Sequence, residues 1–139
     1  MLDTYYESEK GADYGLVLRV ASMGHFPPQA VRRSIEYIHA NLAGAIRLRD
    51  IAGAVGMSMF HLSRTFRAST GLTLHRYLTR ARVEKVKALL LDSDRSLAAI
   101  ADATGFSDES HMSKTFRRFT GTTPRLFRHI RRPHHSAMR

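Results

Sequence analysis

Two short stretches of the sequence carry arginine, serine and histidine at helical spacing between apolar residues. They are residues 59–70, MFHLSRTFRAST, and residues 109–120, ESHMSKTFRRFT. Guanidinium, hydroxyl and amine groups displayed along one side of a helix can hydrogen-bond phosphate oxygens and base edges. We expect the exposed candidates to be Phe60, His61, Ser63, Arg64 and Arg67 in the first stretch, and Glu109, Ser110, Ser113, Lys114 and Arg117 in the second.

The apolar residues of each stretch define the opposite, buried side. Leu62 and Phe66 stand four residues apart and therefore share one helical face. Phe60 either continues that face or projects outward, and the spacing allows both. In the second stretch, the residues expected to point inward are Met112, Phe116 and Phe119.

A further short helix is predicted just before the first stretch. Residues 48–55, LRDIAGAV, place their apolar side chains on one face. Gly56 then suits the left-handed backbone of a tight turn, and Ser58 is a favoured N-cap for the following helix. Gly71 is a natural stop for that helix. Two short helices joined so tightly are typical of a helix-turn-helix unit.

The chain contains two copies of this unit. At an offset of 49 residues, the identical pairs are Leu48/Leu97, Ile51/Ile100, Ala52/Ala101, Gly56/Gly105 and Ser58/Ser107. At an offset of 50 residues, they are Ser63/Ser113, Thr65/Thr115, Phe66/Phe116, Arg67/Arg117, Thr70/Thr120, Gly71/Gly121 and Thr73/Thr123. We place the one-residue slip just after the second turn, where the second unit is longer. Such self-similarity predicts two copies of one helix-turn-helix.

Three more helices complete the expected fold. The first ends before Gly44, and Thr73 caps a longer one over about 74–91, roughly 27 Å in length. Thr123 caps a last helix whose first residue is Pro124. The buried face of the first helix is expected to be Val31, Ile35, Ile38 and Leu42. That of the long helix is Leu74, Tyr77 or Leu78, Ala81, Val83, Val86, Leu89 and Leu90, and that of the last helix is Leu126, Phe127 and Ile130.

We therefore predict an all-α fold with two helix-turn-helix subdomains joined by a long linking helix. The expected subdomains are residues 30–73 and 92–131, and the linking helix is 74–91. An N-terminal arm of uncertain structure, residues 1–29, precedes them, and a basic, disordered tail, residues 132–139, follows. Within the arm, the string YGLVLRV suits a short strand and a helical turn equally.

Net charge is the strongest global signal. Twenty-two basic residues outweigh 12 acidic ones, which gives a net charge of +10 and a pI of about 10.8. After residue 29, 20 basic residues stand against eight acidic ones, and 18 of the 22 bases of the whole chain are arginine. The forked guanidinium of arginine suits phosphate and guanine. This balance indicates a polyanionic partner such as nucleic acid, although a solvated basic surface would give the same count.

The residue inventory argues against catalytic, metal-binding and membrane roles. There is no cysteine, which excludes disulfides, thiolate metal sites and cysteine nucleophiles. The eight histidines lack the spacing of a zinc site, and no motif resembles a nucleophile elbow or a phosphate loop. No apolar run approaches the roughly 20 residues that span a bilayer, and the N-terminus lacks the basic start of a signal peptide. We expect no enzyme activity, cofactor, metal or membrane partner.

The strings IAGAVGMSMFHLSRTFRASTG and IADATGFSDESHMSKTFRRFTGTTPRLFR resemble the DNA-binding region of the bacterial AraC/XylS transcription regulators. The resemblance covers about residues 31–131, and the family's signature lies between Ile100 and Phe127. Met112 stands where the family usually has Phe or Tyr, a departure that a soft apolar side chain tolerates. Many members carry a separate sensing and dimerising domain before this region, for which this chain lacks room. It therefore resembles the short, stand-alone members or an excised DNA-binding fragment.

The resemblance implies a sequence-specific regulator of double-stranded DNA. Two recognition helices, about 59–69 and 109–119, would enter adjacent major-groove segments roughly 34 Å apart, separated by the linking helix. A monomer would suffice, with dimerisation through the arm as an alternative. The family also implies an activator that touches RNA polymerase, in the cytoplasm at the nucleoid. The competing hypothesis is a polymerase- or regulator-binding adaptor on the same fold, which Glu109 and the acidic N-terminus favour.

The resemblance places base contacts at the positions of Phe60, Ser63 and Arg64. Arg64 would fork onto guanine and Phe60 would pack on a thymine methyl, whereas Arg67 is better placed for phosphate. Glu109 either accepts from a cytosine amino group or favours the helix N-terminus. The other expected DNA contacts are Lys114 and Arg117, and Thr73 and Thr123 with the first amides of the helices they cap. For Arg76, Arg80 and Arg82, phosphate contacts and a solvated face remain equal alternatives.

Overall fold

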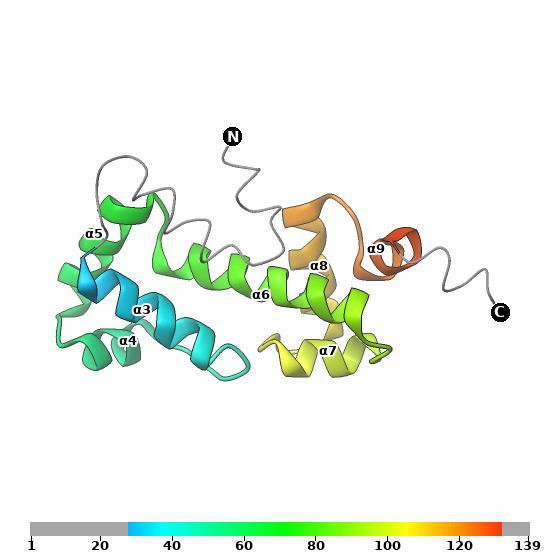
Figure 1. Ribbon diagram of the computed structural model, residues 1–139, viewed down its shortest axis with the longest axis horizontal. Helices are drawn as coiled ribbons and strands as arrows, with labels where there is room; N and C mark the ends of the chain where they lie inside the picture. The colour runs from blue at the N-terminus through cyan, green and yellow to red at the C-terminus, as the bar shows by residue number, and fades with distance from the viewer. Residues whose placement is uncertain (1–27, 132–139) are drawn as a thin grey trace. The chain divides into compact units, whose positions relative to one another are not determined.

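A computed structural model describes residues 28–131, and within this range every regular element is an α-helix (Figure 1). The helices are α3 Gln29–Ala40, α4 Leu48–Val55, α5 Met59–Thr70, α6 Leu74–Asp92, α7 Leu97–Ala103, α8 Glu109–Thr120 and α9 Pro124–Arg131. The all-α prediction is thereby confirmed for the described residues. The expected arm and tail lie outside this range, except that Pro28 and Gln29 already belong to the start of α3.

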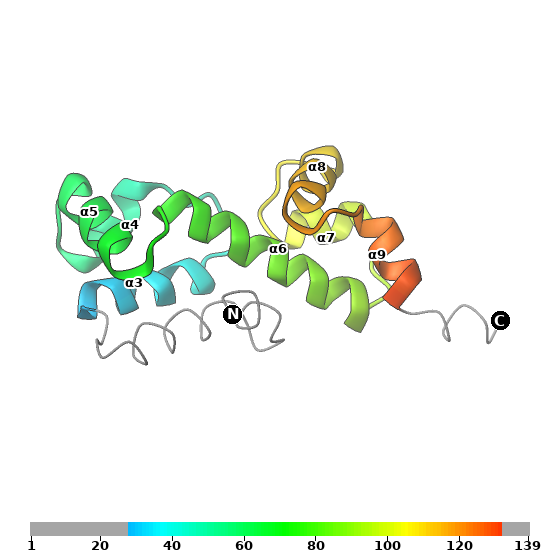
Figure 2. The same ribbon diagram turned by 90° about the horizontal axis from the view of Figure 1, so that it is seen from above.

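The helices pack around two separate apolar cores, and the boundary between the two units falls inside α6, between Ala81 and Arg82. Figure 2 shows α3, α4 and α5 gathered in one unit and α7, α8 and α9 in the other. The first core is Val31, Ile35, Ile38, Ile51, Ala52, Leu62, Phe66, Leu74, Tyr77, Leu78 and Ala81. The second is Val83, Val86, Leu90, Ile100, Ala101, Phe106, Met112, Phe116 and Phe127. Each half of α6 therefore stabilises a different unit.

The first unit begins with an amphipathic helix that ends earlier than its pattern suggests. Val31, Ile35 and Ile38 are buried as expected, but α3 stops at Ala40. The backbone N–H of Asn41 donates to the carbonyls of Tyr37 and Ile38, and its side-chain amide donates to Tyr37 as well. This capping ends the helix before Leu42, which still packs against the core from the loop.

The connections that precede α5 and α8 differ by one residue, and in the second unit that residue lies directly before α8. In the first unit the Ser58 hydroxyl accepts from the His61 N–H at 3.1 Å. In the second, Asp108 caps α8 and accepts from the His111 N–H at 2.7 Å. Ser107 therefore is not the equivalent cap. The extra residue is Asp108, which lies directly after the Gly105-Phe106-Ser107 turn, as expected, and before the first residue of α8.

The corner that follows each recognition helix is the same in both units. The Thr70 hydroxyl donates to the Phe66 carbonyl at 2.8 Å and accepts from the Leu72 N–H at 3.1 Å. Thr120 makes the equivalent bonds to the Phe116 carbonyl and the Thr122 N–H, at 2.8 and 3.2 Å. The glycine between them is left-handed in each case, with φ of 79° and 84°. The repeated Thr-Gly is thus a structural corner that ends α5 and α8 in the same way.

An aromatic pair packs α5 against α6 and another packs α8 against α9. Phe66 meets Tyr77 edge-on with ring centroids 5.7 Å apart, and Phe116 meets Phe127 in the same way at 5.5 Å. Both pairs stand at an offset of 50 residues, so the repeat extends beyond the twelve identities into α6 and α9. The Tyr77 hydroxyl also hydrogen-bonds His39 Nε2 at 3.1 Å. Edge-to-face pairs of this kind add stability beyond their buried area.

The expected buried face of α9 is wrong in two of its three residues. Phe127 is buried, but Leu126 and Ile130 are 47% and 56% exposed. With 3.6 residues per turn, they project about 100° and 60° away from Phe127. The inner side of this short helix is completed by Pro124 instead. Apolar periodicity alone did not show which of the apolar residues of α9 the second core would bury.

Arg128 attaches α9 to the end of α6. Its guanidinium donates to the carbonyls of Leu90, Ser93 and Arg95 at 3.0, 3.0 and 2.9 Å. Leu90 lies in the last turn of α6, and Ser93 and Arg95 follow its last residue, so the guanidinium binds both the helix end and the loop after it. A charged donor also suits the negative end of the helix dipole.

We expect Arg128→Ala to lower the free energy of unfolding by about 1.5–3 kcal/mol, the range for hydrogen bonds to a charged group. Urea unfolding followed by circular dichroism measures this change. Arg125→Ala is the matched control, because Arg125 is exposed on the same helix. Equal stability of the two variants would show that the three carbonyl contacts do not hold α9 in place.

Substitutions at Gly71 and Gly53 are expected to change the free energy of unfolding in opposite directions. A Cβ at either position would meet nothing within 4 Å, but Gly71 has φ of +79° and Gly53 lies within α4. We expect Gly71→Ala to cost about 1–2 kcal/mol, because L residues are strained in the left-handed region. Gly53→Ala should stabilise by about 0.5–1 kcal/mol. Thermal unfolding measures both, and a Gly71→Ala protein as stable as the parent would contradict the corner geometry.

Candidate nucleic-acid interface

The outer face of α5 presents an aromatic ring and a guanidinium together. Phe60 is 71% exposed, so of the two orientations that its spacing allowed it adopts the outward one. The Arg64 guanidinium carbon lies 5.5 Å from the centroid of the Phe60 ring, the geometry of a cation–π contact. Residues four apart on a helix lie one above the other, which brings the two side chains together. His61 and Arg67 are exposed beside them, and Ser63 is half-buried.

The outer face of α8 repeats this arrangement with different chemistry. At the offset of 50 residues that the caps and corners establish, Ser110 replaces Phe60 and Lys114 replaces Arg64. Both are exposed, as are Glu109 and Arg117, and Ser113 is half-buried like Ser63. Arg118 is exposed next to Arg117, where the first unit has Ala68. Sequence reasoning missed Arg118, although the repeat offers the signal, a cation gained where the other copy has alanine.

Two acidic residues stand at the start of α8. Asp108 is the N-cap, and Glu109 is the first helical residue. Carboxylates at this end of a helix are stabilised by its free N–H groups and its dipole. The geometry of Glu109 therefore suits the helix-terminus role, one of its two alternatives, without any contact to a base.

Thr73 and Thr123 begin α6 and α9 in the same way. Each hydroxyl accepts a backbone hydrogen bond at 3.1 Å, from the N–H of Arg76 and of Leu126. Each hydroxyl keeps its own hydrogen to donate to an oxygen. The first N–H groups of a helix also lack partners within it, although Pro124 contributes none. Both helix starts can therefore offer donors to a phosphate.

The arginines of α6 differ in their surroundings. Arg76 is exposed, whereas Arg80 and Arg82 are half-buried. Desolvation by burial lowers the pKa of the Arg82 guanidinium from its ordinary value. Of the three, Arg76 is the residue best displayed for a phosphate.

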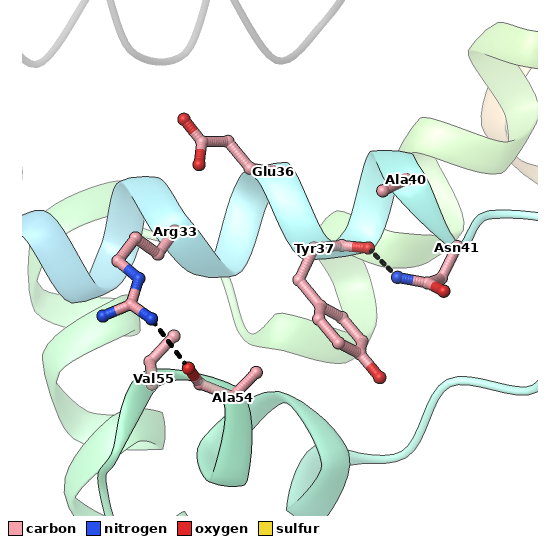
Figure 3. A pocket seen from close by; sticks show the side chains of 7 residues that line it. All are labelled: Arg33, Glu36, Tyr37, Ala40, Asn41, Ala54 and Val55. Atoms are coloured by element: carbon pink, nitrogen blue, oxygen red, sulfur yellow. Dashed lines mark hydrogen bonds between the residues drawn. The ribbon is translucent and has the colours of Figure 1, made fainter.

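A depression on the first unit lies between α3 and α4, on residues other than those of α5 (Figure 3). It has a volume of about 300 Å³ and is lined by Arg33, Glu36, Tyr37, Ala40, Asn41, Ala54 and Val55. The Arg33 guanidinium crosses it to donate to the Ala54 carbonyl at 2.9 Å. Glu36 is its single carboxylate, and no serine, cysteine or histidine lines it. These residues do not form a nucleophile–base pair.

Within the described residues 28–131, no group of three or more His, Cys, Asp or Glu side chains is arranged to hold a metal ion. No helix in that range is long and apolar enough to cross a bilayer.

The fold and the two displayed faces define a double helix-turn-helix protein. The family model of a helix-turn-helix domain matches residues 51–130. The chain therefore belongs to this family, whose members similar to it are AraC-type regulators. This confirms the resemblance seen in the sequence.

Among curated relatives, the transcriptional activator NphR of Rhodococcus is 41% identical over 92 residues, 66% of this chain and 27% of that protein. The HTH-type transcriptional activator RhaS of Escherichia fergusonii is 39% identical over 94 residues, 68% of this chain and 34% of that protein. The chain spans about a third of the length of the curated relatives it matches.

Among solved structures, the DNA-binding domain of AdpA in complex with a target DNA superposes with a TM-score of 0.70 at 27% identity, covering 75% of this chain and 96% of that one. The C-terminal domain of AraT, a response regulator from Geobacillus stearothermophilus, gives a TM-score of 0.72 at 27% identity, with 75% and 87% covered.

Proposed function

We propose that the protein is a sequence-specific double-stranded DNA-binding transcription regulator that inserts α5 and α8 into the major groove. The observation that carries this proposal is the duplicated recognition helix. Each copy is capped, locked by an aromatic pair and displays polar and basic side chains outward. An α-helix fits the major groove, and its outward side chains reach base edges there. The solved AdpA complex supports the same use of the fold.

The displayed residues divide into base-reading and phosphate-binding groups. On α5, Phe60, Ser63 and Arg64 would contact base edges, while His61 and Arg67 lie nearer the phosphates. On α8, Ser110, Ser113 and Lys114 would face the bases and Arg117 the backbone, with Glu109 stabilising the helix start. Thr73 and Thr123 would donate to phosphates at the starts of α6 and α9.

The regulator would act as an activator on a bacterial chromosome, in the cytoplasm. The names of NphR and RhaS as transcriptional activators support this direction, and contact with RNA polymerase would follow from it. Since the chain carries two recognition helices, one copy would suffice for a two-part site. Sedimentation of the protein–DNA complex measures this stoichiometry, and two protein chains per site would contradict it.

The decisive experiment selects bound duplexes from a random DNA pool and then measures affinities by fluorescence anisotropy. We expect a two-part site that binds about 10³-fold or more tightly than a scrambled duplex. Binding should also fall steeply with salt, with a slope of log affinity set by the number of phosphates contacted. Equal affinities for selected and scrambled DNA would overturn sequence reading. Capture of RNA polymerase without DNA would then favour the adaptor hypothesis.

A further inference from the structure

We propose that α5 reads one dinucleotide step, a thymine beside a guanine, through Phe60 and Arg64 acting as a stacked pair. This inference rests on the proposed function and names the DNA feature that the first unit recognises. The two side chains are already in contact in the protein without DNA, so the position of the Phe60 ring restricts where the Arg64 guanidinium can reach.

The exposure of Phe60 indicates an apolar partner. At 71% it is the most exposed of the large hydrophobic side chains in the described residues, and it stands on a helix whose core residues, Leu62 and Phe66, are fully buried without it. The core therefore does not need the ring. In the major groove, the C5-methyl of thymine is the apolar group that a base edge presents.

The contact with Arg64 restricts which bases the pair can reach. A guanidinium that forks onto guanine O6 and N7 is the commonest specific contact to a base. Here the guanidinium lies 5.5 Å from the ring centroid, and successive bases along a strand are about 3.4 Å apart. One base pair cannot supply both a thymine methyl and a guanine edge, since thymine pairs with adenine. The two contacts therefore fall on neighbouring base pairs.

The second unit serves as an internal comparison. Ser110 and Lys114 occupy the positions of Phe60 and Arg64, so α8 has neither the ring nor the planar fork. The ammonium of lysine is a point charge without the fixed bidentate geometry of arginine. Dependence on a thymine methyl beside a guanine should accordingly be confined to the half of the DNA site that α5 contacts.

Single deoxyuridine substitutions test the inference on the selected duplex with the whole chain. Uracil lacks only the C5-methyl, and every thymine is replaced in turn while Kd is measured by fluorescence anisotropy. We expect one thymine, next to a guanine, whose replacement weakens binding about fourfold, the loss for one buried methyl-sized group. Thymines in the other half of the site should show no such loss.

Protein variants assign that methyl to Phe60. With Phe60→Ala, the deoxyuridine and thymine duplexes should bind equally, and folding should be unaffected because the ring is exposed. Phe60→Leu keeps an apolar contact but loses the cation–π contact, so it should retain the methyl dependence and discriminate less at the guanine. Arg49→Ala, an exposed arginine on α4, is the control and should retain the fourfold difference.

The outcomes distinguish a failure of this inference from a failure of the proposed function, sequence-specific DNA binding. If the protein prefers the selected duplex but no thymine responds to loss of its methyl, the stacked-pair inference is overturned and the proposed function stands. The inference is also overturned if Phe60→Ala retains the methyl dependence, or if the responding thymine has no guanine neighbour. If selected and scrambled duplexes bind equally, both proposals are overturned together.

Discussion

Replacing Arg64 with alanine is expected to relax the choice at one base pair of the DNA site by about 5- to 150-fold. This is the range expected for one bidentate contact to guanine, about 1–3 kcal/mol. Arg64 is exposed on α5 and stacked on Phe60, so its loss leaves the core of the first unit intact. Affinities for duplexes carrying each of the four base pairs at every position measure the change.

Arg67→Ala is the matched comparison for Arg64→Ala. Arg67 is exposed on the same helix, one position beyond the buried Phe66, and we propose that it binds a phosphate. Its loss should weaken binding to all sequences alike and reduce the salt slope by about one. If Arg64→Ala also gave a uniform loss, Arg64 would be a phosphate contact. Both arginines of α5 would then bind phosphates, and neither would read a base.

Phe116→Ala should destabilise the second unit by about 3–5 kcal/mol, the usual cost of removing a buried phenylalanine. Phe116 is fully buried, and its ring holds Phe127 at 5.5 Å, so the variant loses both core volume and the anchor of α9. Urea unfolding monitored by circular dichroism measures the effect. Because small domains have only about 5–15 kcal/mol of stability, this loss should be large enough to unfold part of the population on mild warming.

Phe60→Ala controls for the loss of an aromatic side chain as such. The same chemical change at an exposed position should alter stability by no more than about 0.5 kcal/mol. A Phe116→Ala variant that is no less stable than Phe60→Ala would contradict the assignment of the second core. Phe66→Ala is expected to match Phe116→Ala in the first unit, since the two residues occupy equivalent places.

The helices themselves could be predicted because the signals that start and stop them are local. Ser58 and Thr73 cap their helices with their own hydroxyls, Gly71 takes the left-handed conformation that ends one, and Pro124 begins another. These preferences act over one turn of backbone. The predicted bounds 48–55 and 59–70 agree with α4 and α5 to the residue.

The candidate site was less accessible to sequence reasoning than the helices were. Spacing left Phe60 free to be a core residue or an exposed one, and the structure turns it outward onto Arg64. Spacing also counted Leu126 and Ile130 as buried, whereas the second core leaves both exposed. In each case the sequence predicted the helix but not the side that it buries. That side depends on which neighbouring elements pack against the helix.

By itself, the sequence determined the helices, their duplication, the basic character of the chain and the family to which it belongs. The tertiary structure alone decided that Tyr77 and Phe127 are equivalent anchors and that the two halves of α6 belong to different cores. The physical reason is the distance along the chain over which each interaction acts. Caps and periodicity depend on residues within about one helical turn, whereas burial and ring contacts join residues that are brought together only when the chain folds.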